Sequence, residues 1–242
     1  MGEYREIFQA SVTDPAAFWA QAADAVSWTR KPDRILDNDN PPFYRWFPDA
    51  ELNTCANALD RHIEARGDQT ALIYDSPVTG TKRSYTYREL LDQTARFAGV
   101  LRGLGVDKGE RVVLYMPMIP EAVVAMLACA RLGAVHSVVF GGFASHELAT
   151  RIDDATPTVI VSASCGIEPT RVIEYKPMLD HALTRAVHQP RACVIVQRDR
   201  HRCELVDGRD HDWDALMTDA QPVDPVPVAA TDPLYVLYTS GT

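Results

Sequence analysis

The chain has 242 residues, of which 46% are hydrophobic and 24% charged, and its formal net charge is −9. This length and composition are typical of a globular protein with one large domain or two small ones. The negative charge argues against nucleic-acid binding, which depends on positive charge facing phosphates, and the sequence has no run of five or more Lys and Arg.

The cysteines and the apolar segments bear on cellular location. The five cysteines are widely scattered and include no Cys-x-x-Cys pair, which fits free thiols in a reducing cytoplasm. The first six residues contain no apolar segment of the kind found in secretory signals. The longest apolar stretch, 122–130, is about half of the roughly 20 residues that a membrane span needs. We therefore predict a cytoplasmic protein that binds neither membrane nor nucleic acid.

Residues 1–53 are predicted to form a lead-in segment. Asp14 as N-cap and Pro15 at the first helical position predict a short helix there. The polar and proline-rich stretch 37–42 predicts an exposed loop. The aromatic residues of 43–47 are expected to pack the lead-in against the main body, with ligand stacking as the alternative.

From residue 54 onward, predicted helices and strands alternate. A capping box, Thr86 with Glu89, marks the start of one helix, and Gly105 closes it. The predicted elements are helix 54–66, strand 71–74, a turn-rich connection 75–82, helix 87–104, strand 112–116, helix 120–132, strand 137–140, helix 145–155 with Ser145 as its cap, strand 159–161, helix 177–187, strand 193–196 and strand 234–238. This alternation predicts an α/β fold with a mainly parallel sheet flanked by helices.

The last predicted strand, 234–238, is apolar and is expected to lie centrally in the sheet. It leads directly into Thr239, Ser240, Gly241 and Thr242. A strand followed by small and hydroxyl-bearing residues can present backbone N–H groups and hydroxyls to phosphate oxygens. The Gly-x-x-x-x-Gly-Lys pattern of a Walker A loop is absent, and an ordinary surface turn remains an alternative.

Several segments resemble one enzyme family. Tyr-Thr-Ser-Gly-Thr at 238–242 is similar to the first half of the phosphate-loop signature of the adenylate-forming superfamily. The segments 52–62, 139–143, 151–155 and 166–177 resemble acetyl- and propionyl-CoA synthetases, and the last of these resembles the propionyl branch. The resemblance implies that 1–53 is the lead-in of such an enzyme. It also implies that 54–242 is an AMP-binding domain truncated at the phosphate-binding loop.

The resemblance implies a two-step reaction. A short-chain carboxylate and ATP form an acyl-adenylate and pyrophosphate, and CoA then displaces AMP to give the thioester. The expected cofactors are ATP, CoA and Mg²⁺. Thr239, Ser240, Gly241 and Thr242 would donate to the ATP phosphates. In the family the rest of this loop, the acyl pocket and the mobile C-terminal domain with its lysine lie downstream, so we expect the isolated chain to be inactive.

The resemblance also implies residues that contact the nucleotide end of CoA. Carried over by position, they are Phe140, Gly141, Gly142, Glu168, Pro169, Thr170 and Arg171. Paired glycines let backbone approach the adenine, and a guanidinium can bind a ribose phosphate through several donors. Acetyl-CoA synthetases commonly have Arg where this chain has Glu168, whose carboxylate would repel phosphate, so Arg171 is the stronger candidate. No catalytic residue or metal ligand is assigned in this chain.

Three questions stay open at the level of sequence. The chain could be a non-catalytic remnant with weak CoA binding, or could pair with a separately encoded C-terminal half. A Rossmann-type dehydrogenase is disfavoured because Gly-x-Gly-x-x-Gly does not follow any strand. The acid, acetate or propionate, is undetermined because the acyl pocket is not encoded here.

Asp153, Asp154, His201 and His211 are interpreted as solvated surface.

Overall fold

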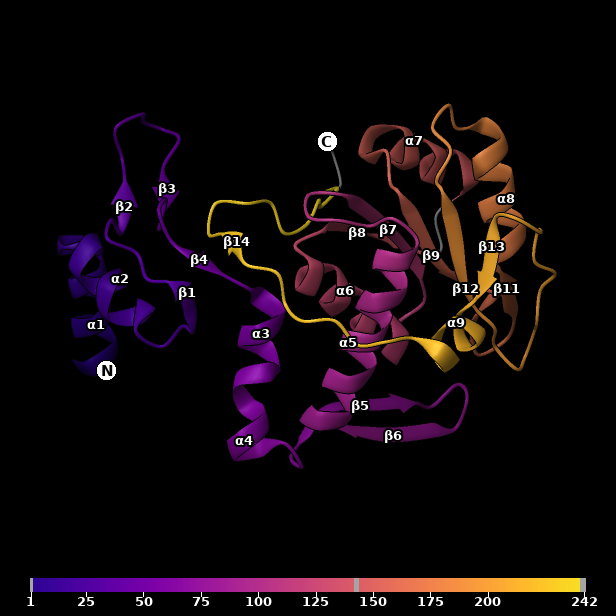
Figure 1. Ribbon diagram of the computed structural model, residues 1–242, viewed down its shortest axis with the longest axis horizontal. Helices are drawn as coiled ribbons and strands as arrows, with labels where there is room; N and C mark the ends of the chain where they lie inside the picture. Colours follow the sequence, from indigo (N-terminus) through magenta and orange to yellow (C-terminus); the bar gives the residue numbers. More distant parts are fainter. Residues whose placement is uncertain (1, 142–143, 240–242) are drawn as a thin grey trace.

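The computed structural model describes residues 2–141 and 144–239 of the chain. Figure 1 shows two regions, a lead-in at the amino-terminal end and an α/β body that carries the helices and strands from residue 54 onward. The body is built around one five-stranded sheet, and its arrangement decides where the functional residues lie.

The strands of the central sheet are all parallel. They are β7 (Arg111–Met116), β8 (Val135–Phe140), β9 (Val159–Ala163), β12 (Ala192–Val196) and β13 (Asp210–Asp212), in the spatial order β13-β12-β9-β7-β8. The predicted α/β fold with a parallel sheet is confirmed. Strand β13 was not predicted, because Asp-His-Asp has none of the apolar pattern by which strands are recognised.

Helices cover both faces of this sheet, which explains why its strands are apolar throughout. Helices α5 (Tyr87–Gly103), α6 (Pro120–Leu132) and α9 (Trp213–Asp219) pack on one face, and α7 (Ser145–Ala155) and α8 (Tyr175–Arg185) on the other (Figure 1). Along β7, Val112 and Leu114 enter the first core, while Val113 and Tyr115 enter the second. A strand buried on both faces needs apolar residues at every position.

The predicted helix ends are largely confirmed. The Thr86 hydroxyl accepts a hydrogen bond from the Glu89 amide at 3.2 Å, and the Thr86 amide donates to the Glu89 carboxylate at 2.8 Å, which completes the capping box. Gly133 closes α6 with a φ of +70°. Ser145 was predicted as a cap but is the first helical residue of α7. Ala144 is the N-cap there, and it makes no side-chain capping bond.

Two predictions in residues 54–86 need correction. The helix expected over 54–66 is divided into α3 (Thr54–Ala58), a 3-10 turn (Asp60–His62) and α4 (Ile63–Arg66), because Leu59 leaves helical geometry with φ −123° and ψ −64°. The turn-rich connection after strand β5 (Thr70–Ser76) is shorter than expected, since Thr81–Thr86 forms a second strand, β6, antiparallel to it.

The lead-in contains α1 (Gly2–Thr13), α2 (Pro15–Ala23), β1 (Trp28–Arg30), β2 (Leu36–Asp37), β3 (Arg45–Trp46) and β4 (Glu51–Leu52), with β14 (Val228–Ala229) paired to β4. The Asp14 cap is confirmed, because its carboxylate accepts from the Ala17 amide at 3.0 Å. Asp37, expected in an exposed loop, is buried in β2.

The aromatic residues of 43–47 do not pack against the main body as expected. The Trp46 ring lies 5.7 Å from that of Trp19, and the Phe47 ring lies 5.3 Å from that of Trp28, so both contacts stay within the lead-in. Phe43 and Tyr44 are exposed. The lead-in therefore has a small, partly exposed aromatic cluster of its own.

The segment 234–238 is not the central strand that its apolar sequence predicted. It lies beside β8, at the edge of the sheet, and is joined to it by a single parallel bridge between His136 and Tyr235. Leu237 is 66% exposed and Tyr235 is 56% exposed. A strand becomes central only when neighbours pair with it on both sides, and sequence pattern does not specify those neighbours.

No helix within 2–141 and 144–239 is both long and apolar enough to cross a membrane.

Candidate functional site

The turn after β8 and the hairpin after β9 meet on one aromatic ring. Gly141 follows β8, and Gly166 lies in β10 (Cys165–Ile167), which pairs with β11 (Val172–Glu174). A Cβ at Gly141 would lie 2.2 Å from the Tyr175 hydroxyl oxygen, and one at Gly166 would lie 2.7 Å from the same atom. Only glycine at both positions lets the backbone approach this ring so closely.

Tyr175 is fixed in this position by its place in the chain. It is the first residue of α8, its amide donates to the Ser164 carbonyl at 3.1 Å, and its ring lies 5.1 Å from that of Tyr115 on β7. The ring is buried, and burial raises the pKa of its hydroxyl. Sequence reasoning gave Tyr175 no role of its own. The sequence signal that could have pointed to this residue is an aromatic side chain directly after a strand, together with glycines on two other segments.

The loop between β10 and β11 is a tight turn that carries four of the expected CoA contacts. The Glu168 amide donates to the Arg171 carbonyl at 2.9 Å, and Pro169 and Thr170 are exposed between them. The Arg171 guanidinium donates from Nε to the Glu168 carboxylate at 2.7 Å. The Glu168 carboxylate therefore occupies one hydrogen-bond donor of Arg171.

The segment before the predicted phosphate loop is held on α7 and β8. The Tyr238 hydroxyl donates to the Asp154 carboxylate at 2.5 Å, and the Arg151 guanidinium lies 5.1 Å from the Tyr238 ring centre. Burial and this bond to Asp154 raise the pKa of Tyr238 to about 12. Asp154 is exposed as expected but is hydrogen-bonded, which its helix-end position did not reveal. Thr239 follows as the last described residue and is exposed.

Part of the expected site lies outside the described residues. These are Gly142, Ser240, Gly241 and Thr242, together with the side chain of Phe140, whose backbone ends β8 opposite Met116 of β7. The structure brings the Gly141 turn and the Glu168–Arg171 turn together through Tyr175. The segment that leads into Thr239 is held by different contacts, those of Tyr238 with Asp154 and Arg151 on α7 and that of Tyr235 with His136 on β8.

The described residues can be compared with what each cofactor requires. Binding of the ribose phosphate of CoA needs a cation. The Arg171 side chain is 68% exposed, so its guanidinium can bind a phosphate from solvent while it still donates to Glu168. The turn at Gly141 offers backbone close to that loop. For Mg²⁺, no three His, Cys, Asp or Glu side chains in 2–141 and 144–239 come together as a metal site. In ATP enzymes Mg²⁺ is held largely by phosphate oxygens and water, so few protein ligands are needed.

Comparison with known proteins identifies the family. Residues 59–242 match the AMP-binding enzyme family, and residues 4–58 match the acetyl-coenzyme A synthetase N-terminus family. The chain belongs to the AMP-binding enzyme family.

Within that family, the chain is similar to short-chain acyl-CoA synthetases, and the resemblance read from the sequence is confirmed. It is 53% identical to the mitochondrial acyl-CoA synthetase short-chain family member 3 of Rattus norvegicus over 100% of this chain and 36% of the relative. It is 46% identical to the propionate–CoA ligase of Escherichia coli K12 over 99% of this chain and 38% of the relative. The chain thus spans little more than a third of the length of these relatives.

A solved structure supports the fold. The acetoacetyl-CoA synthetase from Streptomyces lividans superimposes with a TM-score of 0.88 at 30% sequence identity, covering 96% of this chain and 35% of that chain. This similarity extends over the lead-in as well as the α/β body.

Proposed function

We propose that the chain forms the amino-terminal part of a short-chain acyl-CoA synthetase that joins acetate or propionate to CoA through an acyl-adenylate. In this proposal residues 1–53 are the lead-in and 54–242 belong to the AMP-binding domain. The observation that carries it is the packing of Tyr175 against Gly141 and Gly166, which sets two expected CoA-binding segments side by side. The relatives named as acyl-CoA synthetase and propionate–CoA ligase support the same reaction class.

The chain's own residues would bind and orient substrates. The glycine turn at 141–142 would lie against the nucleotide end of CoA, and Arg171 would bind its 3′-phosphate. Pro169 and Thr170 would border that contact from the tip of the turn. Thr239, Ser240, Gly241 and Thr242 would donate hydrogen bonds to the ATP phosphates, whose charge Mg²⁺ would help to neutralise.

The CoA contact is tested by comparing CoA with dephospho-CoA, which lacks the 3′-phosphate. Arg171→Ala should weaken CoA binding roughly tenfold and leave dephospho-CoA binding unchanged, because one charge-assisted contact is lost. Glu168→Gln should strengthen CoA binding, since it frees the Arg171 guanidinium. Isothermal titration calorimetry measures both.

Arg102 on α5 provides a matched control for this test. It is exposed and lies outside the turns at Gly141 and Arg171. Arg102→Ala should bind CoA as the parent chain does. The proposed phosphate contact would be contradicted if Arg171→Ala and Arg102→Ala lost equal affinity for CoA. It would also be contradicted if Arg171→Ala lost equal affinity for CoA and dephospho-CoA.

We also propose that the 242-residue polypeptide alone does not form acyl-adenylate. The reason is that this chain spans only 36% and 38% of the length of the two relatives with which it aligns. ATP–pyrophosphate exchange with acetate or propionate should stay at background, while the full-length E. coli relative serves as positive control. Turnover above background would contradict this. The alternative is a non-catalytic chain that retains CoA binding, or a chain that acts with a separate C-terminal half. Exchange that is restored on adding that half would distinguish the second case from the first.

A further inference from the structure

The order of the strands creates a crevice that the functions above do not use. Along the chain, β7 is followed by β8 on one side, and the chain then crosses to β9 and β12 on the other side. The connections after β7 and β9 therefore leave the sheet in opposite directions. In open parallel sheets, ligands bind beyond the carboxyl ends of the strands at such a switch point.

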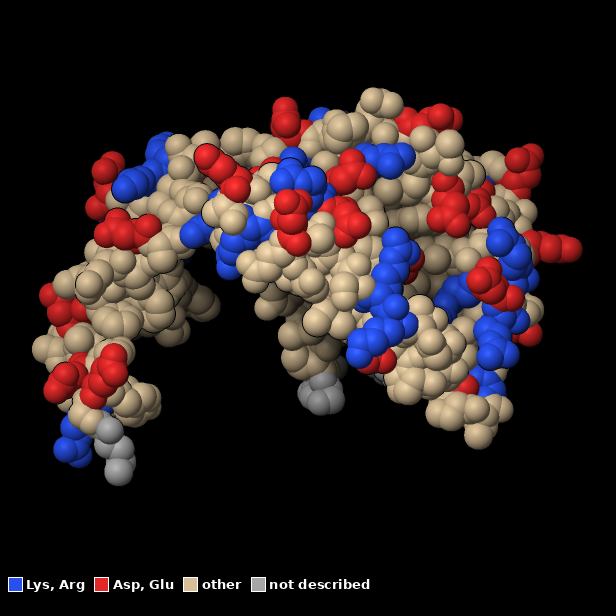
Figure 2. Space-filling view, turned by 90° about the horizontal axis from the view of Figure 1, so that it is seen from below, with Lys and Arg blue, Asp and Glu red and all other residues tan. Residues whose placement is uncertain are grey.

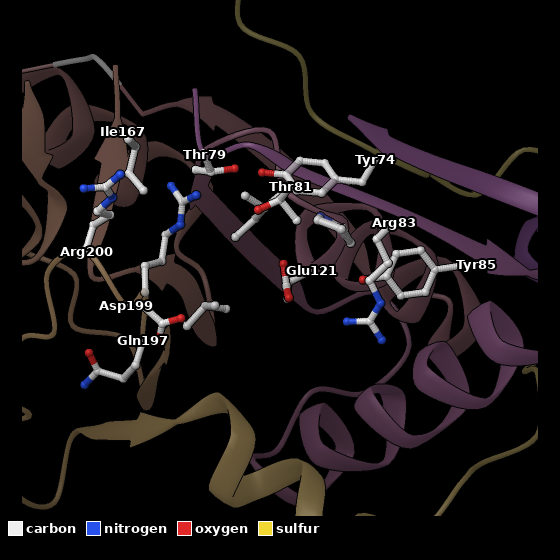
Figure 3. A pocket seen from close by; sticks show the side chains of 14 residues that line it. Tyr74, Thr79, Thr81, Arg83, Tyr85, Glu121, Ile167, Gln197, Asp199 and Arg200 are labelled. Carbon is white, nitrogen blue, oxygen red and sulfur yellow. The ribbon is translucent and has the colours of Figure 1, made fainter. Parts of the chain in front are cut away.

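A cavity of about 420 Å³ lies at this position. Ile119, Pro120 and Glu121 line it from the connection after β7, Ile167 from β10 after β9, and 196–200 from the end of β12. The β5–β6 hairpin closes the opposite side with Tyr74, Thr79, Thr81, Arg83 and Tyr85. Figure 3 shows these labelled side chains facing a common open space from several elements.

Three arginine side chains line the cavity, although the net charge of the chain is negative. Arg83, Arg198 and Arg200 line it, against Glu121 and Asp199. Within the described residues none of these three arginines forms an ion pair, whereas Arg131 and Arg209 are both paired with aspartates. In Figure 2, basic side chains stand on both sides of a hollow in the face that is seen from below.

Two of these arginines are held in place by other contacts. The Arg198 guanidinium donates to the Cys165 carbonyl at 3.2 Å, so the side chain is tied to the start of β10. The Arg198 amide donates to the hydroxyl of Ser164, between β9 and β10, at 2.9 Å. The Arg83 guanidinium lies 4.5 Å from the Tyr85 ring centre. Because both side chains are already positioned, an anion bound here would cost them little ordering entropy.

Glu121 defines what else the ligand must carry. Its carboxylate points into the cavity from the first turn of α6 (Figure 3) and has no ion-pair partner among the described residues. Burial raises its pKa, while Arg198 and Arg83 act in the opposite direction. A carboxylate in this position accepts hydrogen bonds from hydroxyl groups, as acidic residues do for ribose at switch points.

We propose that this crevice binds a phosphate monoester that also carries hydroxyl groups, with Arg83 and Arg198 on the phosphate and Glu121 on the hydroxyls. The threonine hydroxyls of the hairpin, Thr79 and Thr81, border the same space. The site is independent of the proposed CoA and ATP contacts, which involve none of these residues.

The test uses ribose 5-phosphate, inorganic phosphate and ribose as probes for calorimetric titration of the 242-residue chain. Ribose 5-phosphate should bind more tightly than inorganic phosphate, and ribose should not bind measurably. The double variant Arg83→Ala/Arg198→Ala should weaken ribose 5-phosphate binding roughly tenfold or more, because charge-assisted contacts are lost. Glu121→Gln should weaken ribose 5-phosphate severalfold but not inorganic phosphate.

Arg102→Ala is the matched control and should bind like the parent chain. Should the double alanine variant fail to fold, Arg83→Lys/Arg198→Lys keeps both charges and should retain binding at reduced affinity. No binding of ribose 5-phosphate at millimolar concentration, or equal weakening by Arg102→Ala, would overturn the site. Equal affinity for inorganic phosphate and ribose 5-phosphate would overturn the assignment to a hydroxyl-bearing ester.

Discussion

Asp210→Ala should lower the free energy of unfolding by about 3 kcal/mol, because it removes the carboxylate that compensates two cations. The Asp210 side chain is fully buried in β13 and accepts from Lys176 at 2.9 Å and from Arg209 at 2.6 Å. The Lys176 side chain is only 5% exposed, so without Asp210 its charge would depend on Asp180 alone. The Val206 amide, which donates to Asp210 at 2.9 Å, would lose its partner as well.

The same variant should change how stability depends on pH. Burial alone would raise the pKa of Asp210, but the bonds from Arg209, the Val206 amide and Lys176 outweigh it and hold the pKa below its ordinary value. The stability that this carboxylate contributes is therefore present above its unfolded pKa of about 4 and is lost as the pH falls through the folded pKa. Urea unfolding of parent and variant between about pH 3 and pH 7 should show the two chains converging at the acid end.

An exposed ion pair provides the control for this prediction. Asp75 and Lys82 on the β5–β6 hairpin are 3.0 Å apart, with side chains that are 57% and 73% exposed. Asp75→Ala should cost less than about 1 kcal/mol, as exposed pairs usually do. If Asp210→Ala were as mild as Asp75→Ala, the buried network would not hold β13 to α8.

Arg131→Met should cost about 3 kcal/mol, because Arg131 joins three parts of the chain that are distant in sequence. Its side chain is 5% exposed, pairs with Asp60 at 2.8 Å and donates to the Val223 carbonyl at 2.6 Å. Methionine keeps the apolar stem but leaves that carbonyl without this donor. Urea or thermal unfolding measures the loss.

A double-mutant cycle separates the lost pair from the stranded charge. Asp60→Ala alone leaves the Arg131 charge largely buried, so the double variant Arg131→Met/Asp60→Ala should cost less than the sum of the two single changes. Arg30→Met, which breaks an ion pair with Glu51 whose side chains are 60% and 39% exposed, is the matched control. It should cost less than about 1 kcal/mol. Strict additivity in the cycle would show that Arg131 and Asp60 do not act as a pair.

Local sequence signals determined much of this fold. The capping box of Thr86 and Glu89 and the left-handed Gly133 mark helix ends through bonds within a few residues, so they could be recognised without tertiary structure. The apolar runs of β7, β9 and β12 predicted a parallel sheet covered on both faces, and helices do cover both faces. The resemblance to short-chain acyl-CoA synthetases rested on motifs spread over the whole chain, and it too was visible in the sequence.

Contacts between distant residues could not be predicted in this way. The Asn53 amide group donates to the carbonyls of Ala130 and Arg131, both at 3.0 Å, and to that of Val226 at 2.8 Å, which closes the junction between lead-in and body. Nothing in the sequence around Asn53 indicates these partners. In the same way, the place of Tyr175 between Gly141 and Gly166 follows from three segments meeting in space.

The sequence by itself thus determined the family, the kinds of elements and most of their ends, because these depend on propensity, capping and pattern within one segment. Only the tertiary structure decided the order of the strands, the edge position of 234–238 and the arginine-lined crevice at the switch point. The physical reason is that a strand's neighbours and a side chain's partners are chosen by packing among distant segments, whose free energy no local pattern encodes.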